Sequence, residues 1–477
     1  MLPGLEDHWN MDSPWNRDIH KFMLHGLRIL LDVNSGSVHI LDEASWDVLE
    51  ALEQHQGSIP RALASLENKY SPAQLAEIVS ELEGLREQEL LFTSDREVMA
   101  GAGNPAAPAV KSMCFNVAHD CNMRCGYCFA ADISFGGTPQ LMSREVGEAA
   151  MDFLLEQSGS RRHLEVDFFG GEPLLNLDTV AHLTEYGTRQ AEKRGKAIKF
   201  TITTNCLLID EAFTELVNRY NMQVVLSLDG RKTVHDAVRR APGGAGTYDV
   251  IVPRMLQFAE SRHHENYYVR GTYTRKNMDF ADDVFHLFDL GFRHVSLEPV
   301  VAPPEAYGFS EEDIPLLEKE YERLAAGLLE RHEKGQFIDF FHFNVDLEGG
   351  VCIPKRIKGC GAGVEYLAAA PDGRIYPCHQ FVGSSKFLMG EVFQGLKEPA
   401  IGNGFREAHI YNKEICRNCW ARFFCSGGCH ANAYHYSGSL MEPYAIACVL
   451  QKKRLECGIW YQLCKRLGRN TARDVDN

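Results

Sequence analysis

The hydrophobic pattern of the N-terminal part of the chain changes from that of strands to that of helices. Apolar runs predict strands over residues 19 to 33 and 38 to 41, with a hairpin turn at residues 34 to 37. Farther along, apolar residues recur at intervals of three and four, as on one face of an amphipathic helix: Leu75, Ile78, Leu82 and Leu85. Three strands and three helices predict a small winged-helix unit over residues 1 to 95.

The middle of the chain alternates between strand-like and helical patterns. A segment rich in Gly, Ala and Pro, residues 96 to 112, is typical of a linker and marks a domain boundary. Six strand-like runs follow it, with amphipathic helices between them: 113–117, 164–169, 199–204, 223–228, 268–273 and 293–300. This alternation over residues 113 to 310 predicts an α/β fold with a parallel sheet, closed or partly closed as a barrel. Sites in such sheets gather at the C-terminal ends of the strands.

Composition limits the classes of partner and the compartment. Residues 311 to 347 are predicted to form a bridging helical region, and residues 348 to 477 are punctuated by cysteines. The net charge is −16 and no run of Lys and Arg stands out, which argues against nucleic acid as a partner. We find no signal sequence and no apolar stretch of about 18 residues, so we expect a cytoplasmic protein without a membrane partner. Fifteen cysteines in a reducing compartment indicate metal binding rather than disulfides.

Three closely spaced cysteines, Cys121, Cys125 and Cys128, follow the first predicted strand of the sheet. Three thiolates on one loop can ligate three irons of a 4Fe-4S cluster and leave the fourth iron open to a ligand from outside the protein. A zinc knuckle or three buried thiols are the alternatives, although zinc sites usually show paired C-x2-C or Cys/His ligands. The spacing C-x3-C-x2-C, with aromatic Tyr127 before the last Cys, resembles the radical S-adenosylmethionine (AdoMet) enzymes. The resemblance implies that the open iron chelates AdoMet and that one electron cleaves its C-S bond.

A Gly-Gly-Glu-Pro turn follows the second predicted strand. Consecutive glycines let the backbone approach a ligand closely. A Gly-Gly turn after a strand is common by itself, but its place after a three-cysteine loop strengthens the resemblance to radical AdoMet enzymes. In those enzymes the turn holds the methionyl amine, which implies the same role for Gly170, Gly171 and Glu172.

The resemblance implies further AdoMet contacts near the ends of later strands. Ser227 would contact the ribose or the carboxylate, and Arg239 the carboxylate, with which a guanidinium pairs bidentately. Tyr127 and the backbone of Leu297 would lie near the adenine. Cys206 departs from the family pattern, because related enzymes usually have a glycine at this place, and we expect it to be a buried thiol.

A second series of cysteines occupies the C-terminal region: Cys360, Cys378, Cys416, Cys419, Cys425, Cys429 and Cys448. Their spacing resembles the SPASM extension of radical AdoMet enzymes, which binds two auxiliary 4Fe-4S clusters; a zinc ribbon is the alternative. Two complete clusters need eight thiolates, and the seven become eight only if Cys352 joins them. Sulfatase maturases of the same superfamily carry an Asp, proposed as a base, where this chain has His379, which weakens that assignment here.

The resemblance assigns a ligand set to each auxiliary cluster. The first would be held by Cys352, Cys360, Cys378 and Cys429, and the second by Cys416, Cys419, Cys425 and Cys448. If Cys352 is not a ligand, the first cluster keeps an open iron on which a substrate thiolate could bind. Together with the cluster at Cys121, the resemblance implies three 4Fe-4S clusters.

The whole chain is similar to the maturases of SCIFF (six cysteines in forty-five residues) and related ranthipeptides, through residues 31–39, 116–121, 164–173, 268–275 and 420–429. This implies a partial (β/α)6 TIM-like barrel with an N-terminal winged-helix peptide recognition domain and a C-terminal SPASM iron-sulfur domain. It also implies an oxidoreductase that joins a Cys sulfur to a carbon within one ribosomally synthesised and post-translationally modified peptide (RiPP), as a thioether crosslink.

The N-terminal unit would then bind the leader of the precursor peptide as an added strand, although a unit that only caps the catalytic domain is the alternative. An external donor such as flavodoxin or ferredoxin would supply electrons. Two other functions stay open. One is a different radical peptide modification, such as a carbon-carbon crosslink or maturation of an amine dehydrogenase subunit. The other is a non-catalytic iron-sulfur carrier or a winged-helix regulator.

Overall fold

The computed structural model describes residues 9, 15–94, 109–130, 139–348 and 356–468 of the chain. Cys352 and most of the predicted linker over residues 96 to 112 lie outside the described residues. Within the described parts, no helix is both long and apolar enough to cross a membrane.

The N-terminal unit contains the three strands and three helices that the sequence predicts. A short helix, α1 (Trp15–Asp18), leads into an antiparallel sheet of β1 (Ile19–Leu24), β2 (Leu27–Asp32) and β3 (Val38–Leu41). Helices α2 (Glu43–Gln54), α3 (Ile59–Leu66) and α4 (Pro72–Glu87) follow. A two-residue turn joins β1 to β2, and both its residues, His25 and Gly26, have the positive φ that a tight hairpin of this kind requires.

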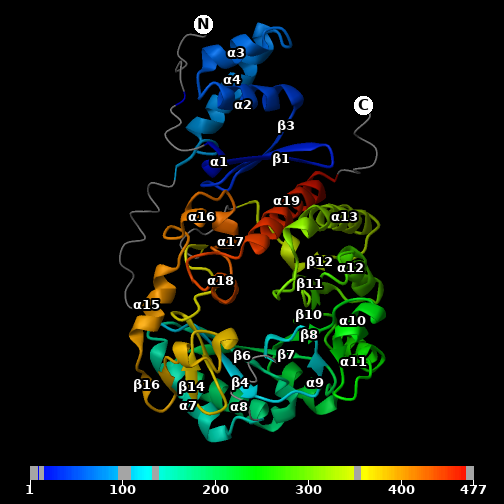
Figure 1. Cartoon of the computed structure of the whole chain (residues 1–477), viewed down its shortest axis with the longest axis vertical. Helices are drawn as coiled ribbons and strands as arrows, with labels where there is room; N and C mark the ends of the chain where they lie inside the picture. The colour runs from blue at the N-terminus through cyan, green and yellow to red at the C-terminus, as the bar shows by residue number, and fades with distance from the viewer. Residues whose placement is uncertain (1–8, 10–14, 95–108, 131–138, 349–355, 469–477) are drawn as a thin grey trace.

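The sheet of this unit is apolar on both faces. Side chains alternate along a strand, so Leu30 packs with the helices of the unit, whereas Ile29 and Leu31 belong to the main core of the protein. All three are fully buried. The N-terminal unit therefore packs against the rest of the chain through its sheet, and Figure 1 shows it above α16, α17 and α19.

The six predicted strands of the middle region form one parallel sheet, in chain order. They are β4 (Ser112–Ala118), β6 (His163–Gly170), β7 (Ala197–Thr204), β8 (Gln223–Ser227), β10 (Tyr267–Tyr273) and β11 (His294–Pro299). Between them lie α7 (Arg144–Gln157), α8 (Leu177–Lys193), α9 (Glu211–Arg219), α10 (Lys232–Val238), α11 (Tyr248–Ser261) and α12 (Phe280–Asp289). The predicted strand positions are confirmed.

The sheet continues beyond these six strands on both sides. Strand β12 (Asp339–Phe340) pairs with β11, and β13 (Tyr366–Ala369) pairs in parallel with β4. Three short antiparallel strands extend it further: β14 (Arg374–Tyr376), β15 (Gly390–Glu391) and β16 (Gly395–Leu396). The result is an open, mostly parallel sheet of eleven strands. The C-terminal region, predicted as a separate domain from residue 348, thus shares its sheet with the middle region.

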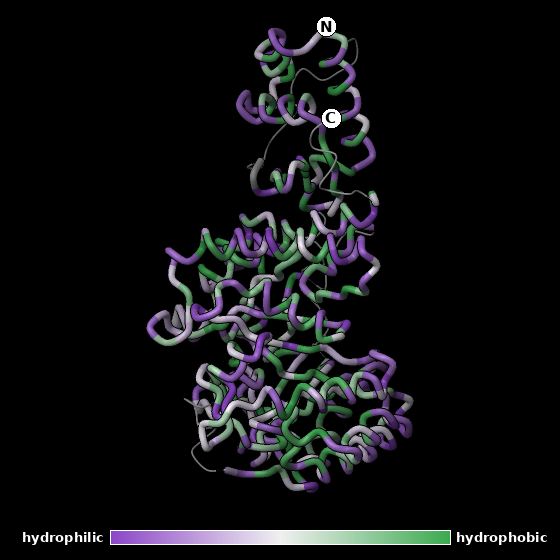
Figure 2. Tube along the Cα trace, turned by 90° about the vertical axis from the view of Figure 1, so that its right-hand side faces the viewer, coloured by the Kyte–Doolittle hydropathy of each residue, from purple (hydrophilic) through white to green (hydrophobic). Residues whose placement is uncertain are grey.

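The two faces of the sheet differ in polarity. In β6, Leu164, Val166 and Phe168 are fully or almost fully buried in the main core, whereas the alternating Glu165 and Asp167 are only half-buried. Figure 2 shows apolar segments gathered inside the lower body of the molecule and hydrophilic segments mostly at its margin. The parallel strands thus present an apolar face to their helices and a more polar face on the other side.

Most of the remaining helices form the upper part of the body, whereas α15 lies at its side near β16 (Figure 1). The remaining helices are α13 (Ile314–Glu333), α15 (Pro399–Glu407), α16 (Glu414–Arg417), α17 (Arg422–Cys425), α18 (His430–Ser437) and α19 (Ala445–Leu467). Arg422, almost fully buried, fixes the N-terminal unit to them: its Nη2 lies 2.7 Å from Asp18 Oδ1 and 2.6 Å from Asn34 Oδ1. Beside it, the rings of His20 and Trp420 stack with centroids 3.7 Å apart.

We expect Arg422→Ala to lower the free energy of unfolding by about 3 kcal/mol, because it removes the closer of the two cations paired with the buried Asp18 carboxylate and leaves only Arg17, whose Nε lies 3.5 Å away. Arg374→Ala removes an exposed pair with Asp372 and serves as the matched control, with an expected loss below about 1 kcal/mol. Urea unfolding measures both. An equal effect of the two substitutions would show that the Arg422 contact does not hold the unit in place.

Candidate active site

The three-cysteine loop begins where β4 ends, at the C-terminal edge of the parallel strands. Its middle forms a two-residue strand, β5 (Arg124–Cys125), which pairs with β9 (Arg239–Arg240) so that Cys125 lies opposite Arg239. Burial raises the pKa of the Cys121 thiol to about 12, and the neighbouring charges of Cys125 and Cys128 contribute to the rise. The three thiols are half-buried and act on one another electrostatically, so the loop brings them together.

The two glycines after β6 allow this strand to pack tightly against the cysteine loop. Gly171 N donates to Ala118 O at 2.7 Å. A Cβ added at Gly171 would lie 2.1 Å from Asp120 O and 3.1 Å from the Cβ of Cys121. Gly170 has a φ of +134°, and a Cβ there would meet Ala118 O at 2.3 Å. Both glycines are therefore required by the close approach of two backbones, whatever ligand they also contact.

Glu172, predicted to help hold the AdoMet amine, is fully buried, and its carboxylate is hydrogen-bonded within the protein. Its carboxylate accepts hydrogen bonds from Leu174 N at 3.0 Å, Thr204 Oγ1 at 2.8 Å and Asn205 N at 2.8 Å. Burial raises its pKa to about 7, against these donors. The Asn205 amide in turn lies 3.7 Å from Cys121 Sγ. Glu172 thus ties the ends of β6 and β7 to each other beside the cysteine loop.

Asp229 is a central residue of the site that the sequence analysis did not single out. It is fully buried, its Oδ2 accepts a hydrogen bond from the Tyr127 hydroxyl at 2.7 Å, and the same oxygen lies 3.0 Å from Arg239 Nε. Arg239 also lies over the Tyr127 ring, 5.6 Å from its centroid. The sequence feature that could have identified Asp229 is its position just after β8, two residues beyond Ser227. The structure brings Tyr127, Ser227 and Arg239 to one strand end, with the Arg239 charge already paired.

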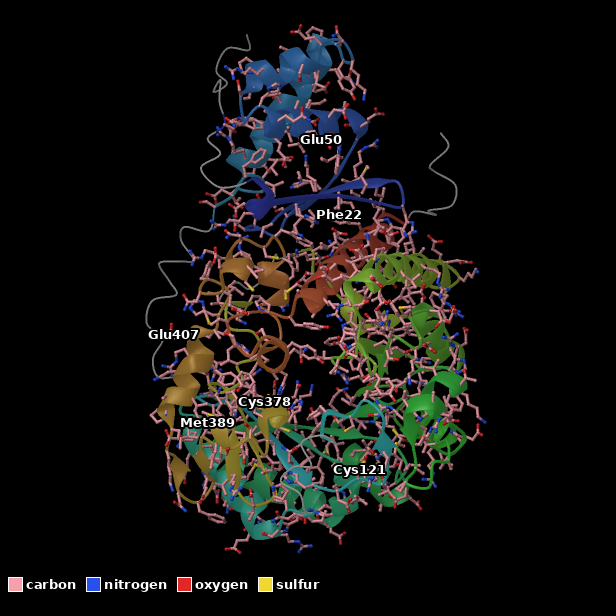
Figure 3. The ribbon with its side chains drawn as sticks, viewed as in Figure 1. Phe22, Glu50, Cys121, Cys378, Met389 and Glu407 are labelled. Atoms are coloured by element: carbon pink, nitrogen blue, oxygen red, sulfur yellow. The ribbon has the colours of Figure 1, made fainter. Side chains whose placement is uncertain are left out.

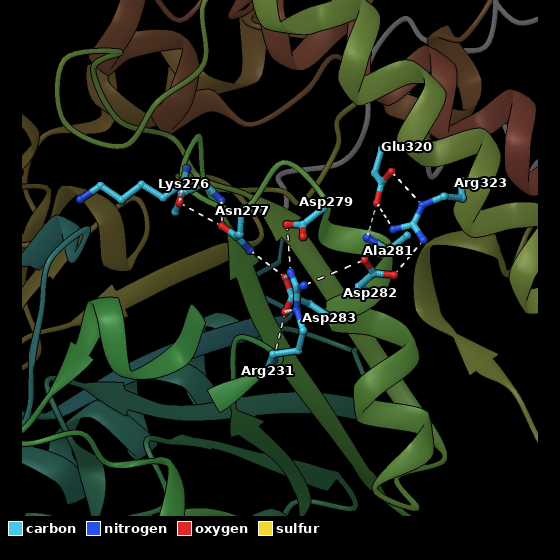
Figure 4. A network of polar contacts seen from close by, with 10 residues as sticks. Arg231, Lys276, Asn277, Asp279, Ala281, Asp282, Asp283, Glu320 and Arg323 are labelled. Carbon is cyan, nitrogen blue, oxygen red and sulfur yellow. Dashed lines mark hydrogen bonds and ion pairs between the residues drawn. The ribbon is translucent and has the colours of Figure 1, made fainter. Parts of the chain in front are cut away.

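An ionic network next to this strand end joins the loop after β8 to neighbouring elements (Figure 4). Arg231 Nε lies 2.8 Å from the fully buried Asp283 carboxylate, which also accepts from Asn277 Nδ2 at 3.0 Å. Farther out, Arg323 connects α13 to Asp282 at 2.7 Å. The network joins the loop after β8 to the loop after β10, to α12 and to α13, and so fixes the backbone that carries Asp229.

The predicted adenine contact, Leu297, is 1% exposed in β11. Gly271 lies opposite it in β10, and a Cβ added at Gly271 would meet the Leu297 side chain at 2.5 Å. The Leu297 side chain therefore packs inside the main core, and only its backbone is in a position to serve a ligand at the strand end.

One buried amide close to the cysteine loop has no protein partner. Asn116, in β4, is fully buried, and neither its Oδ1 nor its Nδ2 has a hydrogen-bond partner among the described residues. Buried polar groups are nearly always hydrogen-bonded, so this amide indicates a polar ligand or water beside β4. Three convergent thiols, a close-fitting glycine turn and an unsatisfied amide fit an iron-sulfur cluster with a polar cofactor.

The C-terminal cysteines fall into two groups. The first group consists of Cys360, Cys378 and Cys429. Burial is the main cause that raises the pKa of Cys378, and the charges of Cys360 and Cys429 raise it further. The second group consists of Cys416, Cys419, Cys425 and Cys448. Burial and the charges of the neighbouring cysteines raise the pKa of Cys416 to about 12 and that of Cys448 to about 11. The family resemblance implies the same two sets as cluster ligands, which stays a prediction, and Cys352 lies outside the described residues. Among the residues that the structure describes, no set of three His, Cys, Asp or Glu side chains is arranged around a single metal ion.

The first of these groups lies close to the three-cysteine loop. His379, directly after Cys378, has its ring centroid 4.8 Å from that of Phe169 at the end of β6, and 5.9 Å from that of Phe129. Figure 3 labels Cys121 and Cys378 in the lower half of the molecule, below the N-terminal unit. Burial and the charge of Arg270 lower the pKa of His379 to about 4, so its imidazole is neutral at pH 7. Arg270, an exposed residue of β10, is a second site residue that the sequence analysis missed.

Known proteins share both the sequence pattern and the fold. A family model described as a 4Fe-4S single cluster domain matches residues 108–242. The cysteine-type anaerobic sulfatase-maturating enzyme of Clostridium novyi is 24% identical over 66% of this chain and 86% of its own length. The radical SAM cyclopropyl synthase TigE of Paramaledivibacter caminithermalis is 24% identical over 72% of each chain.

Two solved structures extend the comparison. The sulfatase maturase anSMEcpe, with bound AdoMet and a Cp18Cys peptide, has a TM-score of 0.62 at 20% identity over 76% of this chain and all of its own. Streptococcus suis SuiB, bound to its precursor peptide SuiA, has a TM-score of 0.51 at 17% identity over 90% of this chain and 98% of its own. The fold is similar to that of radical SAM peptide maturases with a SPASM domain.

Within this maturase-like fold, Cys206 occupies a strained position. Its φ is +71°, in the left-handed region that favours glycine, which is the residue that the family resemblance expects there. It is also fully buried, as predicted. We expect Cys206→Gly to be more stable than Cys206→Ala by about 1 kcal/mol, because both lose the thiol but only glycine relieves the backbone. Thermal unfolding of the two variants compares them; a more stable Ala variant would contradict the strain.

Gly171→Ala should reduce the iron bound by the three-cysteine loop severalfold, because the added methyl group collides with backbone of that loop. Gly243→Ala is the matched control, since nothing lies within 4 Å of its Cβ position, and it should keep the full iron content. Iron and sulfide analysis after anaerobic reconstitution provides the readout. Wild-type iron content in Gly171→Ala would refute the tight packing.

His379 predicts a pH effect on stability. Its folded pKa of about 4 lies below its ordinary value, so between pH 6.5 and 4 the unfolded chain binds a proton that the folded chain does not. Stability is therefore lost as the pH falls through this range. His379→Gln removes the effect, and we expect the wild type to lose of the order of 1 kcal/mol relative to this variant between pH 7 and pH 5. Parallel urea titrations at the two pH values measure the difference, which would be zero if the imidazole were solvated.

Proposed function

We propose that this chain is a radical AdoMet oxidoreductase that installs intramolecular thioether crosslinks in a ribosomally synthesised precursor peptide. One observation carries the proposal: a cysteine loop at the C-terminal edge of a parallel sheet, cradled by two glycines, lies next to the first of two further cysteine groups. On this proposal the six parallel strands are a partial (β/α)6 barrel, the N-terminal unit is a winged-helix recognition domain, and the C-terminal region is a SPASM domain. The protein would act in the cytoplasm.

The side chains have distinct roles in this proposal. Cys121, Cys125 and Cys128 would hold the cluster that, when bound together with AdoMet, supplies a 5'-deoxyadenosyl radical for hydrogen abstraction from the peptide. The protein contributes positioning. Asp229 fixes Tyr127 and Arg239 beside Cys125. Because the Arg239 charge is paired with a buried carboxylate, Arg239 would contact AdoMet through donors that the ion pair does not use.

The second cysteine group would hold one complete auxiliary cluster, and the first group would hold the other. The fourth ligand of the first cluster is either Cys352 or the substrate thiolate. Metal analysis of Cys352→Ala separates the two possibilities: an undiminished iron content supports the open iron, whereas loss of about four irons shows that Cys352 is a ligand.

The N-terminal unit would bind the leader of the precursor peptide as an added strand on β3. Among the described residues β3 pairs only with β2, and its four residues are half-buried, whereas β1 contributes buried residues to the interface with the body. Main-chain hydrogen bonds along such an edge supply affinity for an extended peptide. SuiB, bound to its precursor peptide, has a similar fold over nearly the whole chain, which supports a peptide substrate here. Flavodoxin or ferredoxin would deliver the electrons.

Mass spectrometry of a coexpressed Cys-containing precursor peptide tests the proposal. Each thioether should remove two hydrogens from the peptide mass and make one thiol resistant to alkylation. Cys125→Ala, which removes a ligand of the first cluster, should leave the peptide unmodified. A peptide that loses two hydrogens but keeps all its thiols alkylatable would exclude a thioether.

That last result would favour a carbon-carbon crosslink instead. TigE is named a cyclopropyl synthase, and a relative from Gluconobacter oxydans, 22% identical over 69% of this chain, is named a PqqA peptide cyclase. Similar sequences thus accompany different products. We favour the thioether because of the resemblance of the whole chain to the SCIFF maturases.

A further inference from the structure

Lys413 is a buried cation between the two groups of C-terminal cysteines. Its side chain is 1% exposed, a rare condition for lysine. Its backbone is fixed from both sides: Lys413 N donates to His409 O at 3.1 Å, and Lys413 O accepts from Arg417 N at 2.9 Å, at the start of the helix that carries Cys416. The backbone that carries this side chain is therefore held in place.

The Lys413 ammonium lies against the loop that separates the two cysteine groups. Lys413 Nζ donates to Gly427 O at 3.0 Å. Gly427 lies midway between Cys425, of the second group, and Cys429, of the first. A Cβ added at Gly427 would approach Lys413 Nζ to 3.7 Å, so the loop passes directly over the ammonium. One side chain thus contacts the segment that joins the proposed ligands of two different clusters.

The charge of Lys413 has no carboxylate partner. Within the part of the chain that the structure describes, no Asp or Glu oxygen forms an ion pair with Nζ, and the ammonium donates one hydrogen bond, to the Gly427 carbonyl. Burial lowers the pKa of Lys413, whereas the thiolates of four cysteines raise it: Cys416, Cys425, Cys429 and Cys448. A buried charge is costly unless an opposite charge compensates it. The available opposite charge is that of the cysteine sulfurs.

We propose that the Lys413 ammonium is the shared counter-charge of both auxiliary clusters and raises the reduction potential of each. The inference rests on the proposed function, because it requires the two clusters. A 4Fe-4S cluster with thiolate ligands is negatively charged and becomes more so on reduction, so a fixed cation stabilises the reduced form. The potentials of such clusters respond to nearby charge and to solvent exposure.

A higher reduction potential of the auxiliary clusters would assist thioether formation. When the substrate thiolate bonds to the carbon radical, the product carries one surplus electron. One oxidised auxiliary cluster takes that electron and leaves a neutral thioether, and an external carrier of the flavodoxin or ferredoxin class later removes it. A higher cluster potential favours this transfer. Lys413 is thus a positioning residue for charge, at a distance from the reacting atoms.

The test is a redox titration of the full chain, reconstituted anaerobically and followed by electron paramagnetic resonance. Lys413→Met keeps the length of the side chain without its charge. We expect the reduction equilibrium of both auxiliary clusters to become at least tenfold less favourable, a shift of about 59 mV to more negative potential. The cluster at Cys121 should stay within a few millivolts of its wild-type potential. Lys413→Arg should restore both potentials, and Lys397→Met, at an exposed lysine of the same region, should change neither.

Unchanged auxiliary potentials in Lys413→Met, or a shift of only one cluster, would overturn the shared counter-charge. If Lys413→Met loses auxiliary iron, the comparison passes to Lys413→Arg and Lys413→Gln. The charge model then requires iron to be retained with Arg and lost with Gln, and equal retention contradicts it. Wild-type protein with about four irons instead of about twelve would overturn both this inference and the proposed auxiliary clusters, whereas about twelve irons with unmoved potentials would overturn the inference alone.

Discussion

Parallel pairing of β13 with β4 fixes where the C-terminal region meets the three-cysteine loop. Strand β4 ends at the three-cysteine loop, and β13 begins the segment that leads through β14 to Cys378 and His379. The register sets Ala368 opposite Cys114, and both are buried in one small cluster with Tyr376. A slip of one residue would turn every side chain of β13 to the other face. This pairing therefore determines that His379 reaches Phe169 at the edge of the first site.

A second constraint joins the N-terminal unit to the second cysteine group. Trp420 and Arg422, which contact the unit, lie between Cys419 and Cys425 in the sequence. The loop that would ligate a cluster is thus the same loop that holds the sheet of the N-terminal unit. Binding of metal and docking of the unit stabilise each other in such an arrangement, since each orders the same backbone. The peptide-binding edge proposed on β3 lies on the far side of that sheet from β1.

The sequence was sufficient for features that local patterns encode. Periodicity located the six parallel strands and the three strands of the N-terminal unit, because burial of alternate or clustered side chains is written directly into neighbouring residues. Spacing and resemblance predicted two C-terminal cysteine groups, and their role as cluster ligands stays a prediction. The addition of β13 to β4 was not predicted, because it joins segments about 250 residues apart with no local signal. Asp229, Arg270 and Lys413 were missed for the same reason: their roles come from partners supplied by other elements.

On the proposed function, three thiolates at the C-terminal edge of the sheet hold a cluster that binds and reductively cleaves AdoMet. Anaerobic incubation of the reconstituted protein with AdoMet and dithionite, followed by chromatography, tests it most directly. We expect 5'-deoxyadenosine from the wild type and from Cys448→Ala, which changes only the second auxiliary group, but none from Cys125→Ala. Iron-loaded wild-type protein that leaves AdoMet intact would contradict it.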